Sequence, residues 1–174
     1  MNEPAPAISI AEATDADAAA YADFFWHAWK EAGPEAPGFI GASDQVIAEV
    51  TRPEAFRERI GGPDRRMYLA REGTRVVGFA ATSLHDSRSA ELVGIIVLES
   101  MTGRGIGLRL AEAAIATVGR DGCSTIIVKT ETTNKRARGF YERCGFSTTG
   151  VTTEDVDGVP IDVWVLRRDT VPGS

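Results

Sequence analysis

The feature that most restricts the possible folds of this chain is a glycine-rich loop, residues 102–107 (Thr-Gly-Arg-Gly-Ile-Gly). It follows an expected strand, 90–98, whose part 92–98 is an apolar run, and it precedes a segment, 105–119, whose apolar residues recur at helical spacing. Glycine lets the backbone approach a ligand without a Cβ in the way, and the N–H groups and dipole of a helix N-terminus attract anions. The loop therefore predicts a phosphate site, although a glycine-rich turn without a ligand has the same pattern.

Two well-known phosphate-binding motifs do not fit this loop. The P-loop requires Lys-Ser or Lys-Thr after its last glycine, and none follows here. The dinucleotide pattern G-x-G-x-x-G fails at Leu108 when it is counted from Gly103, and at Leu110 when it is counted from Gly105. Both motifs also open a parallel unit, whereas the strand before this loop ends a meander. The sequence therefore argues against both classes of nucleotide-binding site.

The hydrophobic periodicity and the turn residues predict an alternation of strands and helices. Strands are expected at 8–10, 67–71, 76–83, 90–98, 124–130, 146–152 and 161–167, and helices at 16–32, 43–50, 53–60, 105–119 and 134–144. Three hairpin-linked strands followed by a strand–helix–strand crossover predict a mixed sheet covered by helices. We expect one domain over 1–174, with residues 1–7 as a loose tail.

Length and composition exclude several classes of protein. A chain of 174 residues with 43% hydrophobic residues suits one globular domain, and no apolar run reaches the 18 residues that a membrane span needs. The net charge of −6 argues against nucleic acid as a partner. The N-terminus lacks the features of a secretory signal, so a cytoplasmic location with reduced cysteines is expected. Two cysteines and two scattered histidines, His27 and His85, predict no metal site, and both histidines are interpreted as surface or packing residues.

A second motif lies downstream of the loop. Asn134, Ala137, Phe140-Tyr141 and Gly145-Phe146 have the spacing N-x-x-A-x-x-F-Y-x-x-x-G-F. This segment is similar to the signature of the GNAT superfamily of acetyltransferases. The glycine loop resembles the core of the family's pyrophosphate loop, [QR]-x-x-G-x-[GA], and residues 90–97 resemble its fourth strand. The resemblance is specific over about residues 90–146.

The resemblance implies an α/β (α+β) fold with a mixed, mostly antiparallel sheet of six to seven strands. About four helices would flank this sheet, which would splay between its fourth and fifth strands. Acetyl-CoA would lie in that gap, with its pyrophosphate on the glycine loop and its pantetheine arm along the backbone of the fourth strand. The implied contacts are Ile95, Ile96, Val97, Thr102, Gly103, Arg104, Gly105, Ile106, Gly107, Asn134 and Phe140. Gly94 in mid-strand predicts either a bulge that opens the gap or a packing glycine beneath an aromatic ring.

Two positions depart from the family pattern. Thr102 stands where Gln or Arg is usual, and Glu99 stands where proline is usual. The lost side chain at 102 would have helped to hold the pyrophosphate. The main-chain donors of 103–107 remain, and Arg104 adds a positive charge beside them, so the departure bears on affinity more than on family membership.

The resemblance also implies catalytic residues. Tyr141 matches the family's catalytic tyrosine, whose phenol would protonate the leaving thiolate as a general acid; the alternative is a core tyrosine. Glu91 is the candidate general base, in a strand whose alternation would place it on one face with Val93, Ile95 and Val97; the alternative is a solvated charge at a strand end. Asn134 is expected to cap its helix.

The implied reaction is acetyl transfer from acetyl-CoA to a primary amine of a small molecule, peptide or protein, by direct attack in a ternary complex. The alternative is a catalytically silent acyl-CoA-binding module of the same fold. In this family the first helix and the loop after it, here 33–41, border the acceptor site, so Phe25 and Trp29 are the candidate acceptor residues. The acceptor carries no sequence signature. Neither a monomer nor a homodimer is favoured.

Overall fold

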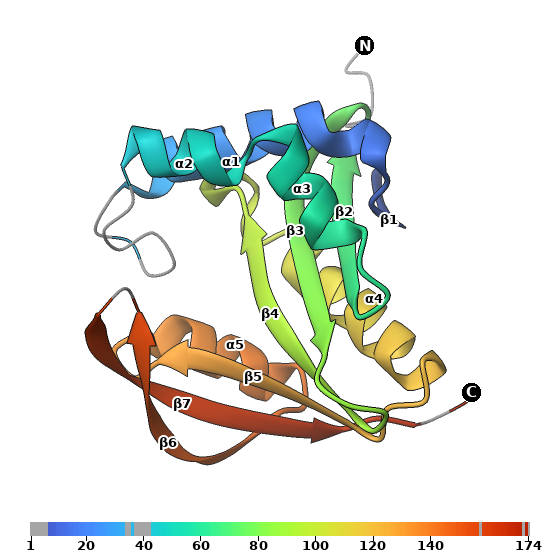
Figure 1. Ribbon diagram of the computed structural model, residues 1–174, viewed down its shortest axis with the longest axis vertical. Coiled ribbons are helices and arrows are strands. Elements are labelled where there is room, and N and C mark those ends of the chain that lie inside the picture. Colours follow the sequence, from blue (N-terminus) through green and yellow to red (C-terminus); the bar gives the residue numbers. More distant parts are fainter. Residues whose placement is uncertain (1–6, 34–35, 37–42, 157, 172, 174) are drawn as a thin grey trace.

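The computed structural model describes residues 7–33, 36, 43–156, 158–171 and 173 (Figure 1). The predicted tail, 1–7, therefore lies outside the described residues except for Ala7, as does most of the loop 33–41. The strands are β1 Ile8–Glu12, β2 Arg65–Glu72, β3 Arg75–Leu84, β4 Ser89–Val97, β5 Thr125–Glu131, β6 Ser147–Val156 and β7 Val159–Asp169. The α-helices are α1 Ala18–Ala32, α2 Asp44–Val50, α3 Pro53–Ile60, α4 Ile106–Arg120 and α5 Lys135–Arg143.

Every predicted strand and helix is present. The expected helix at 16–32 begins instead with a short 3₁₀ turn, η1 Asp15–Asp17, and a second one, η2 Glu99–Met101, follows β4. The family resemblance implied about four helices, and the described residues form five α-helices because α2 and α3 are separate, with Pro53 at the start of α3.

The seven strands form one mixed sheet in the order β1-β2-β3-β4-β5-β7-β6. All neighbouring pairs are antiparallel except β4 and β5, which are parallel and pair only from Ser89–Leu92 to Thr125–Val128. Beyond Leu92 the two strands diverge, as Figure 1 shows. The predicted splay between the fourth and fifth strands is confirmed.

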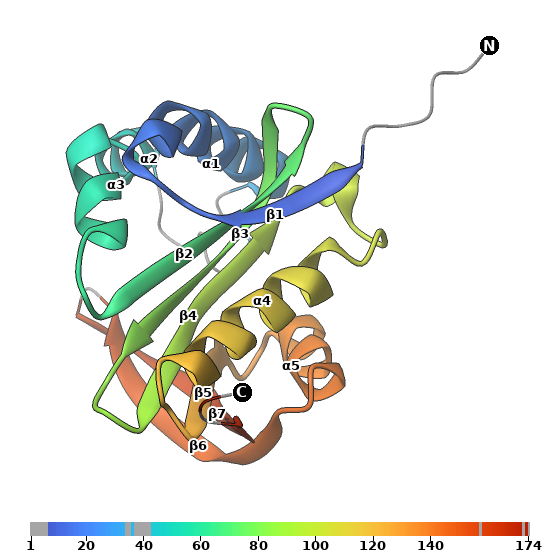
Figure 2. The same ribbon diagram turned by 90° about the vertical axis from the view of Figure 1, so that its right-hand side faces the viewer.

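Helices cover the two parts of this sheet differently. The helices α1, α2 and α3 lie over one face of β2–β4, and α4 lies over the other face (Figure 2). The helix α5 lies on the same side of the sheet as α4, against β5 and β6. Apolar residues from both layers form one core, and its largest fully buried side chains include Tyr21, Phe24, Phe56, Leu92 and Leu110. No helix among the described residues is both long and apolar enough to cross a membrane.

The bulge predicted near Gly94 is present in β4. Ala81 of β3 pairs with Gly94, and Thr82 pairs with Leu92, so Val93 is the inserted residue; its exposed fraction is 61%. A Cβ built on Gly94 meets nothing within 4 Å, which rules out the alternative of a glycine packed beneath a ring. The bulge shifts the alternation of side chains by one residue.

This shift corrects the predicted face of Glu91. By register, Glu91 pairs with Ser83 and Ile96 pairs with Phe79, so these residues share the face that packs against α1. Ile95 and Val97 share the opposite face with Leu92, toward α4. Strict alternation across the strand had placed Glu91 with Ile95 and Val97, and that expectation is wrong because one inserted residue reverses the phase.

Candidate active site

The glycine loop adopts a conformation that requires glycine. Gly103 and Gly105 have φ angles of 77° and 73°, in the left-handed region where an L side chain is strained. A Cβ at either position would meet nothing within 4 Å, so backbone conformation, and not lack of space, selects glycine. The first backbone hydrogen bond of α4 runs from the Arg109 N–H to the Gly105 carbonyl at 3.1 Å. The N–H groups of residues 106–108 therefore have no acceptor inside the helix.

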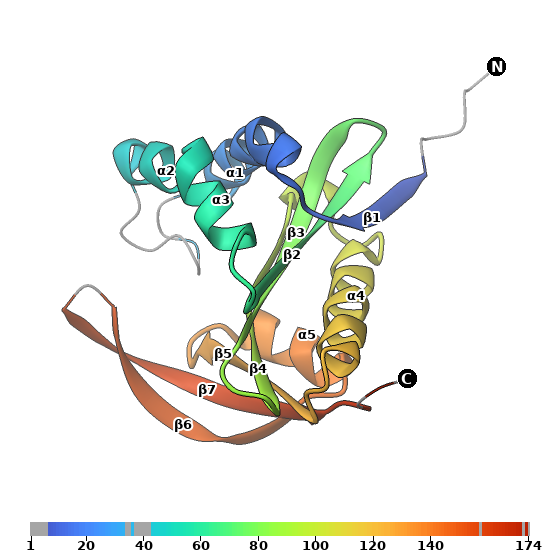
Figure 3. The ribbon, with the colours of Figure 1, turned by 45° about the vertical axis from the view of Figure 1, so that its right-hand side comes forward.

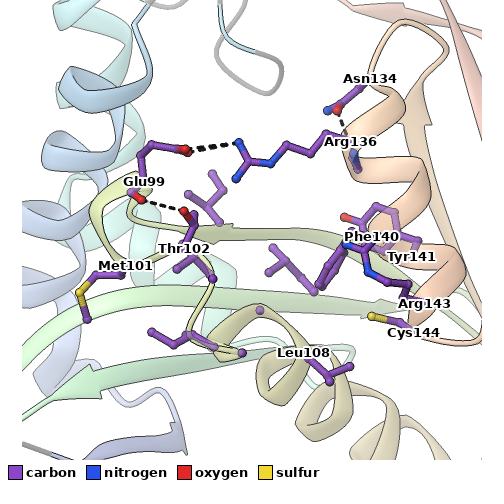
Figure 4. Close-up of a pocket in the computed structure, with 18 of the residues that line it drawn as sticks. Glu99, Met101, Thr102, Leu108, Asn134, Arg136, Phe140, Tyr141, Arg143 and Cys144 are labelled. Atoms are coloured by element: carbon purple, nitrogen blue, oxygen red, sulfur yellow. Dashed lines mark hydrogen bonds and ion pairs between the residues drawn. The ribbon is translucent and has the colours of Figure 1, made fainter.

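A cleft of about 680 Å³ lies beside this loop, between the end of β4, the start of α4 and the inner side of α5 (Figure 4). It sits where β4 and β5 separate, so the gap in the sheet and the glycine loop belong to one site. Ten of the eleven residues predicted to contact the cofactor line it, namely Ile95, Ile96, Val97, Thr102, Gly103, Gly105, Ile106, Gly107, Asn134 and Phe140.

Arg104 is the predicted residue that does not line the cleft. Its guanidinium binds Glu72 at the end of β2, at 2.9 Å, and also contacts the sulfur of Met101. The hydroxyl of Thr102 donates to the Glu99 carbonyl at 2.9 Å, which closes the turn η2. The Thr102 hydroxyl and the Arg104 guanidinium are thus both hydrogen-bonded to other groups of the protein.

A cation from α5 takes up a position across the cleft instead. Arg136 lines the cleft, and its Nη1 lies 3.4 Å from both carboxylate oxygens of Glu99 (Figure 4). Glu99 is itself held in place, because the Glu31 carboxylate at the end of α1 accepts its N–H at 2.7 Å and the Ser100 hydroxyl at 2.9 Å. Arg143, a second cation of α5, also lines the cleft.

Asn134 caps α5 as predicted, with its side-chain oxygen accepting the Ala137 N–H at 3.0 Å. The helix ends at Arg143, and Gly145, which follows the C-cap residue Cys144, has the left-handed φ of 85° that is common just after a helix. Phe140 on α5 packs closely against α4, since a Cβ on Gly107 would lie 3.3 Å from its ring. Gly107 thus permits the close approach of the two helices that form the cleft.

Tyr141 follows Phe140 and also lines the cleft, although only 7% of it is exposed. Burial, and to a smaller extent the nearby Cys144, raises the pKa of its phenol to about 12. The hydroxyl has no hydrogen bond to another described residue. Tyr141 is thus a protonated donor at neutral pH, at the wall of the cleft.

Cys144, one helical turn beyond Phe140, brings a thiol to the same wall. Burial is the main reason that its pKa is raised. A thiol with a raised pKa is a poor nucleophile at neutral pH. Cys123 is also free and buried. Within the described parts of the chain, no group of three or more His, Cys, Asp or Glu side chains could hold a metal ion.

Glu91 does not line the cleft; it lies on the face of the sheet that packs against α1, one residue before the last residue of β4 that pairs with β5. One of its oxygens lies 2.8 Å from Nε2 of His85, in the turn between β3 and β4. Lys129 of β5 is on the same face and interacts electrostatically with Glu91. Tyr141, the candidate acid, and Glu91, the candidate base, thus lie on opposite faces of the sheet, near the place where β4 and β5 separate.

The two candidate acceptor residues also lie away from the cleft. Trp29 is buried in the core, and its indole N–H donates to Asp44 at 3.0 Å. Phe25 is half-buried and packs against Tyr21 and Phe79. Because Phe79 and Glu91 share one face of the sheet, Phe25 lies over the same face as Glu91. Their role toward an acceptor stays a prediction.

Sequence reasoning missed the cleft residues Arg136, Ala137, Arg143 and Cys144. A usable signal existed, since 136, 140 and 143, like 137, 141 and 144, are spaced by three or four residues and therefore share one side of a helix. Glu99 and Met101 had no such signal, because they lie in an irregular turn.

Comparison with known proteins identifies the family. The sequence profile of the Acetyltransferase (GNAT) family matches residues 23–146. An uncharacterized N-acetyltransferase of Mycobacterium bovis is 31% identical over 116 residues, which are 67% of this chain and 74% of that protein. N-alpha-acetyltransferase 30 of Schizosaccharomyces pombe is 29% identical over 83 residues, 45% of this chain and 55% of that one.

The fold agrees with this result. The crystal structure of the PaiA N-acetyltransferase from Thermoplasma acidophilum, in complex with coenzyme A, superposes with a TM-score of 0.70 and 18% identity, covering 94% of this chain and 99% of that chain. The profile match spans more than half of the sequence, including both motifs of the cleft. The chain therefore belongs to the GNAT family of acetyltransferases and is an N-acetyltransferase.

Proposed function

We propose that this protein transfers the acetyl group of acetyl-CoA to a primary amine of a small molecule or of a peptide or protein, by direct attack in a ternary complex. The observation that supports this most is the convergence of the glycine loop, the free edge of β4 and Tyr141 on one cleft at the gap in the sheet. Glu91 lies on the opposite face of the sheet from Tyr141, so the amine can approach from a different side than acetyl-CoA.

The residues of the loop fit a pyrophosphate. Left-handed Gly103 and Gly105 carry no side chain, and the N–H groups at the start of α4 have no acceptor inside the helix. Arg136 and Arg143 add positive charge to the cleft, although the chain as a whole has a net charge of −6. We assign Arg136 the cationic role that Arg104 was predicted to play, because Arg136 lines the cleft and Arg104 does not.

The edge of β4 fits a pantetheine arm. One edge of the strand pairs with β3 along its length, but the edge toward β5 has no partner strand beyond Leu92. The backbone groups of Ile95 and Val97 on that edge can therefore hydrogen-bond to the amide groups of the arm, as an added strand would.

The chemistry needs an amine without its proton, a polarised thioester carbonyl and a donor to the leaving thiolate. Tyr141 supplies the donor, since its raised pKa keeps it protonated. Glu91 supplies the base on the other face. Burial raises the pKa of the Cys144 thiol, which disfavours the thiolate that an acetyl-cysteine intermediate would need. This supports direct attack.

The face that would admit the acceptor is the side of β5, β7 and β6 away from α5, where no described helix covers the sheet (Figure 3). It carries polar groups, including Lys129, which binds Glu154 at 2.8 Å. The yeast relative is named for acetylating α-amines. An amine at a chain terminus is therefore one of the acceptors to test, beside small-molecule amines.

The experiment is isothermal titration of the protein with acetyl-CoA, with ATP and NAD as controls. We expect selective binding of acetyl-CoA and a loss of at least about 100-fold in affinity in Gly105→Glu, because a left-handed residue gains a side chain and a negative charge at the anion site. The matched control is Gly122→Glu, at the other end of α4, where φ is 90° and a Cβ also has open space. Equal binding by Gly105→Glu and the wild type would refute the proposed site.

A further inference from the structure

His85 is one of two histidines in the chain and the one whose side chain contacts a candidate catalytic group. Its Nε2 lies 2.8 Å from Oε2 of Glu91. The imidazole side chain is 44% exposed and the Glu91 side chain 21% exposed. The sequence predicted a surface or packing histidine, and the structure instead places it against the candidate base.

The turn that carries His85 is fixed by its own hydrogen bonds. The His85 N–H donates to the Ser89 carbonyl at 2.9 Å. The Asp86 carboxylate accepts the N–H groups of Arg88 and Ser89 at 2.7 and 2.8 Å, and it also accepts the Ser89 hydroxyl. The imidazole therefore projects from an ordered turn between two paired strands, which limits where its ring can lie.

The distance between His85 and Glu91 requires a proton between them. An N···O separation of 2.8 Å is a hydrogen bond, and two lone pairs would repel each other there. With Glu91 ionised, Nε2 carries the hydrogen and donates it to Oε2. The second oxygen, Oε1, keeps its lone pairs for another donor.

The other charged groups near Glu91 do not replace this bond. Lys129 of β5 faces it, but the Lys129 ammonium binds Glu154 of β6, and this hydrogen bond is the main reason that the pKa of Lys129 is raised. Asp86 of the same turn is occupied by Arg88 and Ser89. Within the described chain, His85 is the side chain that forms a hydrogen bond to Glu91.

We propose that His85 is a positioning residue for acetyl transfer: it donates Nε2–H to Oε2 of Glu91 and thereby orients Oε1 toward the amine of the acceptor. This inference rests on the proposed function, in which Glu91 is the base. As the C–N bond forms, the proton of the amine passes to Oε1 and the Nε2 hydrogen stays on His85. The C–S bond of the thioester breaks, and Tyr141 protonates the leaving thiolate. The proton on Oε1 then leaves to water on the open face, and water returns a proton to Tyr141.

The kinetic test compares two replacements of His85. His85→Phe cannot donate a hydrogen bond and lowers kcat about tenfold, the usual cost of a lost hydrogen bond to a charged group, with KM for acetyl-CoA unchanged. His85→Gln can donate an amide N–H and stays within about threefold of the wild type. In a Glu91→Gln background, His85→Phe changes kcat less than about twofold, because the group through which it acts is gone. His27→Phe, at an exposed position of α1, is the control and leaves kcat unchanged.

Imidazole NMR provides a readout that does not depend on turnover. The chain has two histidines, so the signals of both rings can be assigned, and His27 is an internal reference. In Glu91→Gln the ring ¹⁵N and ¹H signals of His85 move, and those of His27 do not.

The outcomes separate this inference from the proposed function. Unmoved His85 signals in Glu91→Gln overturn the inference, whatever the turnover. A slow Glu91→Gln together with a fully active His85→Phe, or a His85→Gln as slow as His85→Phe, also overturns it and leaves Glu91 as the base. A fully active Glu91→Gln refutes the base itself, and the positioning role with it.

Discussion

The strands β1–β4 and the strands β5–β7–β6 belong to one sheet, but described helices cover both faces of β2–β4 and one face of β5–β7–β6. In β4 the residues Ala90 and Leu92 are fully buried, and in β5 Ile126 and Val128 continue the same apolar face. On the opposite face of β5, Lys129 remains partly exposed and ion-paired. The two regions therefore share one apolar layer and differ on the other face.

This difference explains where the site lies. A strand packed on both faces is apolar on both, and it offers rigidity but few functional groups. A strand with one open face can keep charged side chains there, because water solvates them. The boundary between β4 and β5 joins the region β1–β4 to the region β5–β7–β6. A rigid strand edge from the first region and ionisable groups on the open face of the second therefore lie close together.

The largest expected effect tests the two faces of β5 with neighbouring residues. Ile126→Ala empties a fully buried position of β5, on the face that continues the buried face of β4, and should cost about 3 kcal/mol in the free energy of unfolding. Ile127→Ala, on the partly exposed face, should cost about 1 kcal/mol or less. Urea denaturation of both variants measures the difference. Equal losses would show that the face described as open is packed in solution.

The next largest effect tests the acid role of Tyr141, on the face of the sheet that α5 covers. Tyr141→Phe removes the phenol donor and should lower kcat about 10- to 100-fold, with the affinity for acetyl-CoA retained. Steady-state kinetics and titration of acetyl-CoA measure the two quantities. An unchanged kcat with intact binding would remove the acid role from the α5 side and leave Tyr141 as a core residue.

Tyr141→Phe should also change how the free energy of unfolding depends on pH in alkaline solution. The folded pKa of Tyr141 is about 12 and the unfolded value is about 10, so the folded state alone keeps the proton between these pH values. The stability from this group is complete below pH 10 and is lost as pH rises toward 12, by about 3 kcal/mol in total. Tyr141→Phe should lose stability less steeply above pH 10. Tyr21 and Tyr68, whose pKa values burial also raises, continue to contribute in both proteins.

Much of this fold could be predicted because local sequence determines it. The apolar spacing of 105–119, the breaker Gly145 and the two-residue turn Gly73-Thr74 fix their elements without reference to distant residues. The glycine loop and α5 were recognised for the same reason. The faces of β4 could not be predicted, since the inserted Val93 reverses them and only pairing with β3 reveals it.

The hydrogen-bond and ion-pair partners of the side chains in and near the site also could not be predicted from local sequence patterns. Arg104 adjoins the loop in sequence but binds Glu72, and Arg136 comes from another helix to face Glu99. The contact of His85 with Glu91 depends on the turn that brings β3 back against β4. The first two pairs join residues that are distant in sequence, and the third depends on how the β3–β4 turn folds, so none follows from local helix or strand patterns.

The smallest expected effect tests the ion pair that joins the two regions at the mouth of the cleft. Arg136→Gln removes the cation that faces Glu99, and it should weaken acetyl-CoA binding about three- to tenfold, more at low salt than at high salt. The matched control is Arg138→Gln on the same helix, whose guanidinium binds Glu142 and stacks on Trp164 outside the cleft. It removes the same charge and should leave the affinity within about twofold of the wild type. Titration of both variants with acetyl-CoA at two salt concentrations measures the difference. Equal losses of affinity in Arg136→Gln and Arg138→Gln would mean that the net charge of α5 governs binding, and not the position of Arg136 in the cleft.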